Sequence, residues 1–327
     1  MRLYSRRAFT LTGASLTTMA SLPVFAQSGF PNRPVKLYVG ASAGGGPDAT
    51  ARSIADGLKP VWGQSVVVDN RPGAAGVLAA ELTAQAAPDG HTLCLLLDSV
   101  LTTVPFVTDK MPVDPLKDLK PIAMVGGFPM VLVANPSVVK YRNLREFAAE
   151  ARDKPGKIDY ASSGVGGPGH LAMETFSGMT GISVNHVAYK GGLPALQDVL
   201  AGHIPLMWSS IFAALPSLQS GRLVALGIGS SDRFPLAAGV PTAIEQGYAG
   251  FTAGNWLGVF GPAGLSDALT QRIHDDLEKL AANPAYRDAL LAQGTRVTSM
   301  PASDFARTIR SEYERNKALF ARLNISK

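Results

Sequence analysis

Short apolar runs alternate with amphipathic stretches along most of this 327-residue chain. Many of the runs are β-branched and end in glycine, serine or proline, a pattern typical of an α/β fold with a largely parallel sheet. From about residue 265 onward the pattern is helical, with Ser266 and Ser303 as expected N-caps and Gly294 as a stop. Strands are predicted at 35–41, 65–70, 92–98, within 122–135, and at 158–162, 184–189, 204–209, 223–229 and 255–263.

Four of these strands end in a loop of small residues that leads into a helix. The segments read "GASAGGGPDATARSIADGL", "YASSGVGGPGHLAMETF", "VAYKGGLPALQDVLAG" and "LMWSSIFAALPSL". In the first, Ala51, Ile54, Leu58 and Val61 are expected on one helical face against a sheet. A helix start offers unpaired N–H groups and a partial positive charge, and glycine lets a ligand approach the main chain. The sequence therefore predicts that these loops enclose one small carboxylate.

The first 26 residues differ from the rest of the chain. They carry Arg2, Arg6 and Arg7, no acidic residue, and a weakly apolar stretch that ends in small residues, as an export signal does. The adjacent arginines in "SRRAFT" favour the twin-arginine type, although ordinary signals also carry adjacent arginines, and cleavage is expected near Ala26. Pro23 and the polar residues around it argue against a membrane span. We therefore expect a soluble protein in the periplasm.

Composition narrows the classes further. With 46% hydrophobic residues the chain is long and apolar enough for two compact domains. Loss of the three signal arginines would lower the formal net charge from +5 to +2, and without a basic block no nucleic-acid partner is expected. Cys94 lies in an apolar run and is expected to be a buried thiol. The histidine spacings predict no metal site, and no cofactor is expected.

Other functions fit the loops less well than ligand binding. The glycines of 44–46 lack the Lys-Ser/Thr of a Walker A loop and the dinucleotide pattern G-x-G-x-x-G. An exported serine hydrolase that uses Ser163 and His170 is the alternative function, although the G-x-S-x-G elbow is absent. Asp48 fits a structural cap or a ligand contact, and His170 a loop hydrogen bond or a ligand contact. Lys190 would either meet a carboxylate or face solvent.

Four segments together resemble one family. These are "FPNRPVKLYVGASAGGGPDATAR", "VVVDNRPGAAGVLAAELTAQAAPDGHTL", "YASSGVGGPGHLAMETFSGMTGISVNHVAYKGGLPALQDVLAGHIPLMW" and "GVPTAIEQGYAGFTAGNWLGVFGPAG". They closely resemble the Bug (TctC-like) receptors of tripartite tricarboxylate transport. The resemblance implies a periplasmic binding protein of type II, not an enzyme, with two α/β domains and a ligand cleft between them. The domains would be 28–128 plus 252–327 and 129–251, after a signal peptide at 1–26.

The resemblance also implies partners and ligand-contacting residues. It implies a monomer that binds a small molecule through loop amides and water, for a membrane permease or a sensor kinase. The family's ligand loops fall on Ala43, Gly44, Gly45, Gly46 and Asp48, on Asp98 and Ser99, on Ser162, Ser163, Gly164 and His170, on Tyr189, Lys190, Gly191 and Gly192, and on Ser209 and Ser210.

Two positions depart from the family pattern, namely Asp98-Ser99 and Ser209-Ser210. An acid in the cleft repels a carboxylate unless the ligand brings a cation or Asp98 turns inward to cap a backbone group. The hypothesis is therefore that the ligand is not a plain dicarboxylate and that an amino-acid-like or partly neutral molecule fits better. The small-molecule classes expected are carboxylates, amino-acid-like molecules and aromatic acids.

Overall fold

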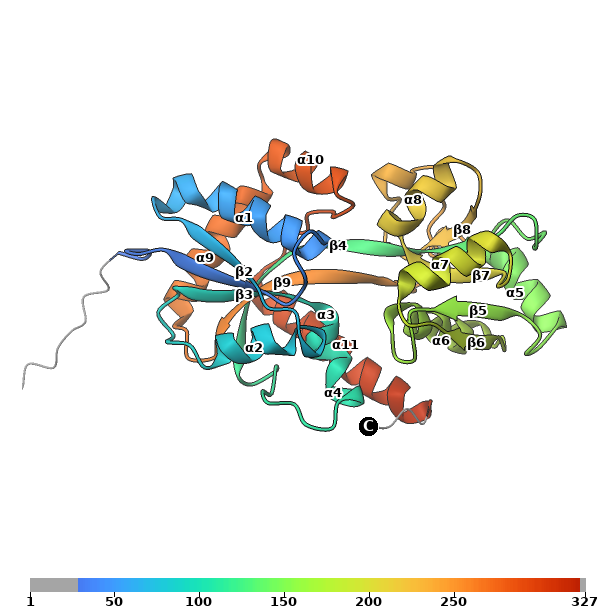
Figure 1. Ribbon diagram of the computed structural model, residues 1–327, viewed down its shortest axis with the longest axis horizontal. Helices are drawn as coiled ribbons and strands as arrows, with labels where there is room; N and C mark the ends of the chain where they lie inside the picture. The colour runs from blue at the N-terminus through green and yellow to red at the C-terminus, as the bar shows by residue number, and fades with distance from the viewer. Residues whose placement is uncertain (1–28, 324–327) are drawn as a thin grey trace, which may run out of the picture.

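The computed structural model describes residues 29–323, which form two lobes joined by two long strands (Figure 1). The export-signal prediction for residues 1–26 lies outside this range. Each of the nine predicted strands is confirmed to within a few residues. They are β1 (Val35–Val39), β2 (Val66–Asn70), β3 (Thr92–Leu97), β4 (Leu119–Ala134), β5 (Asp159–Ser162), β6 (Asn185–Ala188), β7 (Leu206–Ser210), β8 (Val224–Ile228) and β9 (Gly254–Pro262).

Helices follow most of the strands. They are α1 (Gly46–Trp62), α2 (Val77–Ala84), α3 (Asp98–Thr102), α4 (Val104–Val107), α5 (Leu144–Asp153), α6 (Pro168–Thr180), α7 (Gly192–Ala201), α8 (Ile211–Gln219), α9 (Asp267–Ala281), α10 (Pro284–Ala292) and α11 (Ala302–Arg322), with 3₁₀ turns at Ala74–Gly76 and Pro235–Ala237. Ser266 caps α9 as predicted, accepting the Leu269 N–H. The Ser303 cap is wrong, because Pro301 holds the extended N-cap position and Ser303 lies inside α11. In the part of the chain described, no helix is long and apolar enough to cross a membrane.

The strands form one curled sheet in the order β2-β1-β3-β9-β4-β7-β5-β6, with β8 also paired to β4. Pairing is parallel among β2, β1 and β3 and among β7, β5 and β6, but β9 and β4 are antiparallel to their neighbours. The largely parallel sheet predicted from the sequence is therefore a mixed one. An apolar run shows where a strand lies but not its direction.

Strands β4 and β9 carry the chain between the lobes. Gly127 pairs with Trp256 and Pro129 with Gly254, and from Met130 onward β4 pairs with β7 instead. We call residues 127–130 and 254–256 the crossing.

In the register of the sheet, both sets of parallel strands end beside the crossing. In the first lobe β3 ends where Leu97 pairs with Leu257, one residue beyond the crossing, and β1 runs parallel to it. In the second lobe β7 ends where Ser210 pairs with Met130, and β5 and β6 run parallel to β7. The loops after β1, β3, β5, β6 and β7 therefore meet the crossing from opposite sides.

Helix α1 packs on the first sheet by a slightly different face from the predicted one. Ala51, Ile54 and Leu58 are buried as expected, but Val61 is 49% exposed and Trp62 is buried in its place. At about 100° per residue, Trp62 returns to within about 20° of Ala51, whereas Val61 lies about 80° away. The buried indole N–H of Trp62 donates to Asp276 at 3.0 Å. Cys94 is fully buried, as predicted, and burial raises the pKa of its thiol to about 12.

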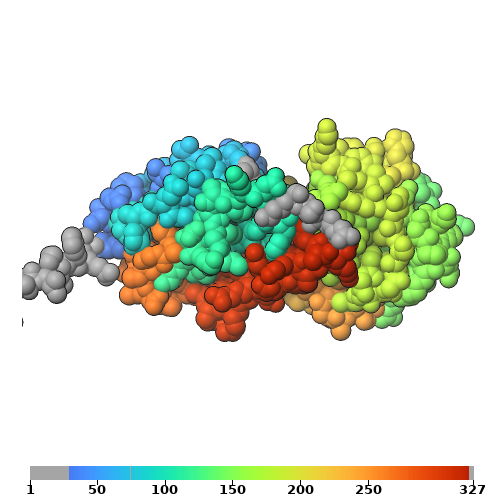
Figure 2. Space-filling view, turned by 90° about the horizontal axis from the view of Figure 1, so that it is seen from below, coloured from blue at the N-terminus to red at the C-terminus, as the bar shows by residue number. Residues whose placement is uncertain are grey.

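The lobes also touch outside the crossing. Helix α11 begins in the first lobe and reaches the second, as Figure 2 shows in red, and Arg322 Nη2 donates to the Glu174 carbonyl at 3.3 Å. Arg296 of the first lobe pairs with both carboxylate oxygens of Asp232 in the second, at 2.7 and 2.5 Å. These contacts join the two lobes outside the crossing.

Candidate functional site

The first-lobe loop runs from the end of β1 to the start of α1. Gly44, Gly45 and Gly46 are exposed, and a Cβ built on Gly46 meets no atom within 4 Å. Asp48 is buried, and its Oδ2 accepts the Gly44 N–H at 2.9 Å. The Arg52 guanidinium lies 3.1 Å from the same oxygen and holds the pKa of Asp48 below its ordinary value. Of the two roles predicted for Asp48, this geometry gives it the structural one.

The loop after β5 is closed by side chains from its own lobe. Ser162 Oγ accepts the Gly164 N–H at 3.1 Å and lies 2.6 Å from His186 Nε2. His170 is buried in the first turn of α6, and its Nδ1 accepts the Gly166 N–H at 2.9 Å. This hydrogen bond is the loop-organising one of the two roles predicted for His170.

The His170 and His186 rings stack in parallel. Their centroids are 4.1 Å apart at an interplanar angle of 7°, and Tyr160 stacks on the other face of His186 at 4.9 Å. Burial lowers the pKa of both histidines, that of His186 to about 4 with help from the neighbouring ring. His186 is absent from the predicted site. Its proximity to Ser162 arises from the parallel pairing of β5 with β6, which no local pattern reveals.

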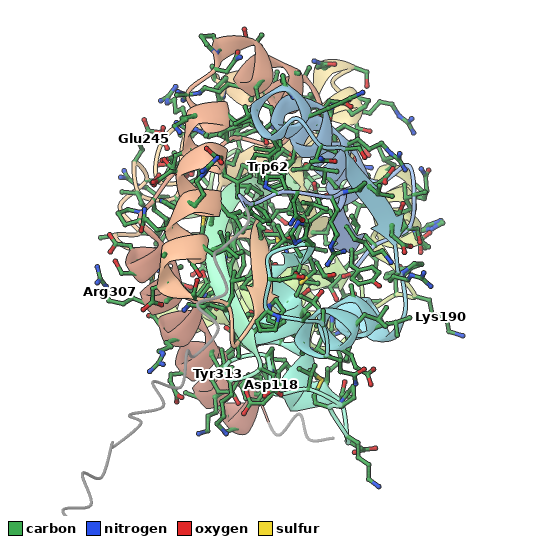
Figure 3. All side chains as sticks on the ribbon, turned by 90° about the vertical axis from the view of Figure 1, so that its left-hand side faces the viewer. Trp62, Asp118, Lys190, Glu245, Arg307 and Tyr313 are labelled. Atoms are coloured by element: carbon green, nitrogen blue, oxygen red, sulfur yellow. The ribbon has the colours of Figure 1, made fainter. Side chains whose placement is uncertain are left out.

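The two remaining second-lobe loops combine buried and open residues. The Tyr189 hydroxyl donates to Asp198 at 2.6 Å, whereas Lys190 is exposed and extends away from the body of the protein (Figure 3). Gly191 has φ +122°, and Gly192 begins α7 with open space at its Cβ position. Ser209 is buried and donates to the Ser210 carbonyl, while Ser210 precedes α8.

Asp98 occupies a different environment from the other predicted residues. It begins α3, and its Oδ1 accepts from Asn255 Nδ2 of the crossing at 3.0 Å. Burial raises the pKa of Asp98 to about 7, and nearby Glu312 adds to the effect. The Asp98 carboxyl group therefore bonds to β9. With a raised pKa it repels a ligand carboxylate less than a fully ionised acid would. The prediction that the ligand is not a plain dicarboxylate loses that support.

A cavity of about 580 Å³ lies between the lobes beside the crossing. Its walls come from α3, α6 and α11, the crossing and the segments around Asp232 and Arg296, and of the predicted site it includes only Asp98 and Ser99. Several of its polar groups bond to one another. Trp256 Nε1 donates to Glu312 at 2.8 Å, and Asn316 donates to the carbonyl of Thr102 at 2.9 Å. We call this space the interlobe cavity.

Apolar side chains stand exposed beside the second-lobe loops. Val165 is 59% exposed, Leu193 69% and Phe212 60%, and each lies just before or within the first turn of α6, α7 or α8. Exposed large apolar side chains at helix starts are typical of a surface that another molecule or another part of the protein covers.

The geometry does not assemble the predicted hydrolase pair. The lone pair of His170 Nδ1 is used by Gly166, and the serine–histidine pair that does form joins Ser162 to His186. Ser162 is fully buried and also bonds the Gly164 backbone, so no substrate carbonyl can reach its Oγ. Among residues 29–323, no three His, Cys, Asp or Glu side chains cluster as metal ligands.

Comparison with known sequences gives one consistent relationship. A family described as the tripartite tricarboxylate transporter family receptor (TctC) matches residues 50–325. Protein BugT of Bordetella pertussis is 36% identical over 298 residues, 90% of this chain and 91% of BugT. A UPF0065 protein from the gbd 5' region of Cupriavidus necator is 32% identical over the whole chain and 98% of its own length.

Solved structures agree with the sequence matches. A TctC solute-binding protein from Polaromonas superposes with a TM-score of 0.79 at 25% identity, covering 90% of this chain and 99% of that one. R. palustris Rpa4515 with adipate gives 0.74 at 28% identity, covering 91% and 99%. MatC from Rhodopseudomonas palustris with bound malate gives 0.69 at 29% identity, covering 88% and 99%. The predicted fold class, that of periplasmic solute-binding proteins, is confirmed.

Proposed function

Because this chain belongs to the tripartite tricarboxylate transporter receptor family, whose members are solute receptors rather than enzymes, we propose that it captures a small carboxylate between its lobes. The ligand would lie among the strand-end loops, and hinge motion at the crossing would close the lobes around it. The proposed contacts are the loop residues named in the sequence analysis, apart from the side chains of Asp48, Asp98 and His170, which are hydrogen-bonded within the protein.

The electrostatics of the loops support an anionic ligand. The starts of α1, α6 and α7 face the crossing with their partial positive ends. The acidic side chains nearest to them are already engaged, Asp48 by Arg52 and Asp198 by the Tyr189 hydroxyl. Main-chain donors therefore dominate the surface that a ligand would meet.

The exposed apolar group supports a ligand with a carbon body. Val165 and Leu193 border the starts of α6 and α7, and Phe212 borders the start of α8, so a molecule that combines a carboxylate with an aliphatic or aromatic body would satisfy both features. The similar proteins Rpa4515 and MatC are solved with adipate and malate. We rank aliphatic and aromatic carboxylates above amino-acid-like ligands, since the case for the latter depended on Asp98.

The cellular role follows from the family. The protein would act in the periplasm after loss of residues 1–26, as a monomer with domains at 28–128 plus 252–327 and at 129–251. A membrane permease or a sensor kinase would receive the closed form. Uptake and sensing require the same binding site.

Two loop glycines allow a direct test of the site. Gly46 and Gly192 begin α1 and α7, lack a positive φ and have no neighbour within 4 Å of a built Cβ. Gly46→Leu and Gly192→Leu should each keep the wild-type melting temperature and abolish the ligand-induced thermal shift across a panel of carboxylates.

The matched control is Gly239→Leu, at an exposed glycine that is equally open. It should preserve the ligand-induced shift. Ligand shifts retained in both loop variants would place the site elsewhere.

A further inference from the structure

The two lobes close their glycine loops by the same local device. In each, the backbone N–H of a glycine donates to a side chain four residues later in the first turn of the following helix. Gly44 donates to Asp48 Oδ2 at 2.9 Å, and Gly166 donates to His170 Nδ1 at 2.9 Å. We call these two hydrogen bonds the first-lobe clasp and the second-lobe clasp.

The acceptors of the two clasps respond differently to protons. Asp48 is a carboxylate that Arg52 stabilises, and it accepts hydrogen bonds whenever it is ionised. His170 accepts only through the lone pair of a neutral imidazole, and a proton added at Nδ1 takes that lone pair away. The second-lobe clasp therefore exists in one protonation state only.

The surroundings of His170 contain groups that act in both directions. Glu174 on α6 lies 4.0 Å from its Nε2 and favours the charged ring, while the Tyr160 hydroxyl of β5 donates to the same carboxylate. His186 of β6 stacks on it and would repel a second charge, and Arg322 of α11 reaches the backbone carbonyl of Glu174. Burial favours the neutral imidazole more than Glu174 favours the charged ring, and so it lowers the pKa of His170.

We propose that His170 makes the second-lobe loop proton-sensitive, so that protonation opens its clasp on Gly166 and the receptor releases its ligand in acid while the first-lobe clasp stays closed. The release of ligand rests on the proposed function, whereas the opening of the clasp does not. The loop that opens carries Ser163, Gly164 and the exposed Val165.

The pH window follows from the direction of each shift. The pKa of His170 lies below its ordinary 6.5, so the clasp is intact at neutral pH and weakens as the pH falls through that lowered pKa. The pKa of His186 lies at about 4, and the pKa of Asp48 lies below 3.8. The first-lobe clasp therefore stays closed down to pH 4, and a clasp that opens above this pH is the second-lobe one.

Amide hydrogen exchange of the ligand-free protein tests the clasp directly. Between pH 7.5 and 4, the protection factor of the Gly166 amide should fall by up to about tenfold per pH unit once His170 protonates, while that of Gly44 stays constant. His170→Asn places a non-titrating oxygen near the position of Nδ1, so Gly166 protection should become independent of pH. Glu174→Gln, which removes the carboxylate that favours the charged ring, should move the transition to lower pH.

Calorimetry with adipate over the same pH range tests the consequence. Wild-type affinity should fall by up to about tenfold per pH unit below the transition, and the slope should be smaller in His170→Asn, where only protonation of adipate itself remains. The proposed proton sensitivity of the clasp would be wrong if the protection of Gly166 in the wild type did not change with pH, or if it changed equally in His170→Asn. Pronounced clasp opening without adipate binding at pH 7.5 would count against the proposed ligand class and leave the clasp standing.

Discussion

The strand-end loops and the interlobe cavity both adjoin the crossing, but they differ in how far their polar groups are already hydrogen-bonded within the protein. In the cavity, charged and amide side chains bond to each other, as Glu312 does to Trp256 and Asp98 to Asn255. In the loops, exposed glycines leave main-chain donors open, and the side chains that are fixed serve only to hold the loop. Buried polar groups that satisfy one another stabilise a structure, whereas open donors at helix starts await an external acceptor.

The size of a space is therefore a poor guide to its role in this protein. The interlobe cavity is roomy, but several of its polar groups already bond to one another, whereas the loops present exposed glycines at helix starts. Three predictions test this contrast, from the largest effect to the smallest.

The largest effect concerns glycines of the two regions. A Cβ at Gly229, on the wall of the interlobe cavity, would lie 2.5 Å from the Ala253 carbonyl oxygen, whereas a Cβ at Gly46 meets nothing. Gly229→Ala should lower the free energy of unfolding by about 1–3 kcal/mol, and Gly46→Ala should change it by under about 0.5 kcal/mol. Chemical denaturation of the two variants measures both. Equal effects would mean that the two walls are packed alike.

The second prediction concerns the buried carboxyl of the cavity. Burial raises the folded-state pKa of Asp98 from 3.8 to about 7. Between these pH values the folded state holds a proton that the unfolded state has lost, so wild-type stability falls as the pH rises through this range. Asp98→Asn keeps an acceptor for Asn255 and removes the titration. Its stability relative to wild type should rise between pH 4 and pH 7 by on the order of 1–3 kcal/mol, measured by thermal melts. A constant difference would show that Asp98 is ionised throughout.

The smallest effect concerns Lys190, the cationic side chain next to the glycines of the β6–α7 loop. Because it extends outward, Lys190→Ala should change the affinity for the best carboxylate of the screen by less than about threefold. A charged hydrogen bond to the ligand would instead be worth about 1.5–3 kcal/mol, at least tenfold in Kd. A loss of affinity of that size in calorimetry would show that a side-chain ion pair with Lys190, and not main-chain donors alone, recognises the ligand.

Local patterns were enough to predict the strands, the loops and their helix starts. Apolar runs and glycine clusters are read within a few residues, and so is the Ser266 cap. Val61 was wrongly placed in the core because the choice between it and Trp62 depends on a rotation of about 100° after three turns. The sequence carries no clear signal for such a small difference.

Contacts between distant residues were beyond prediction. Asp98 contacts Asn255 across 157 positions because β3 and β9 pair in an order that differs from the order of the chain. Ser162 contacts His186 across 24 positions because β5 and β6 pair in parallel. The same reordering makes β9 antiparallel in a sheet that was expected to be largely parallel. The loops themselves were therefore easier to predict than the directions of their side chains.

The position of β9 in the sheet has a consequence for how the chain is built on the ribosome. Strand β9 lies between β3 and β4, so the first lobe lacks a central strand until residue 262 has been synthesised. The second lobe has its last strand at Ile228. As synthesis runs from the N-terminus, the inserted lobe can fold first, and the lobe that starts the chain must wait with the edges of β3 and β4 unpaired.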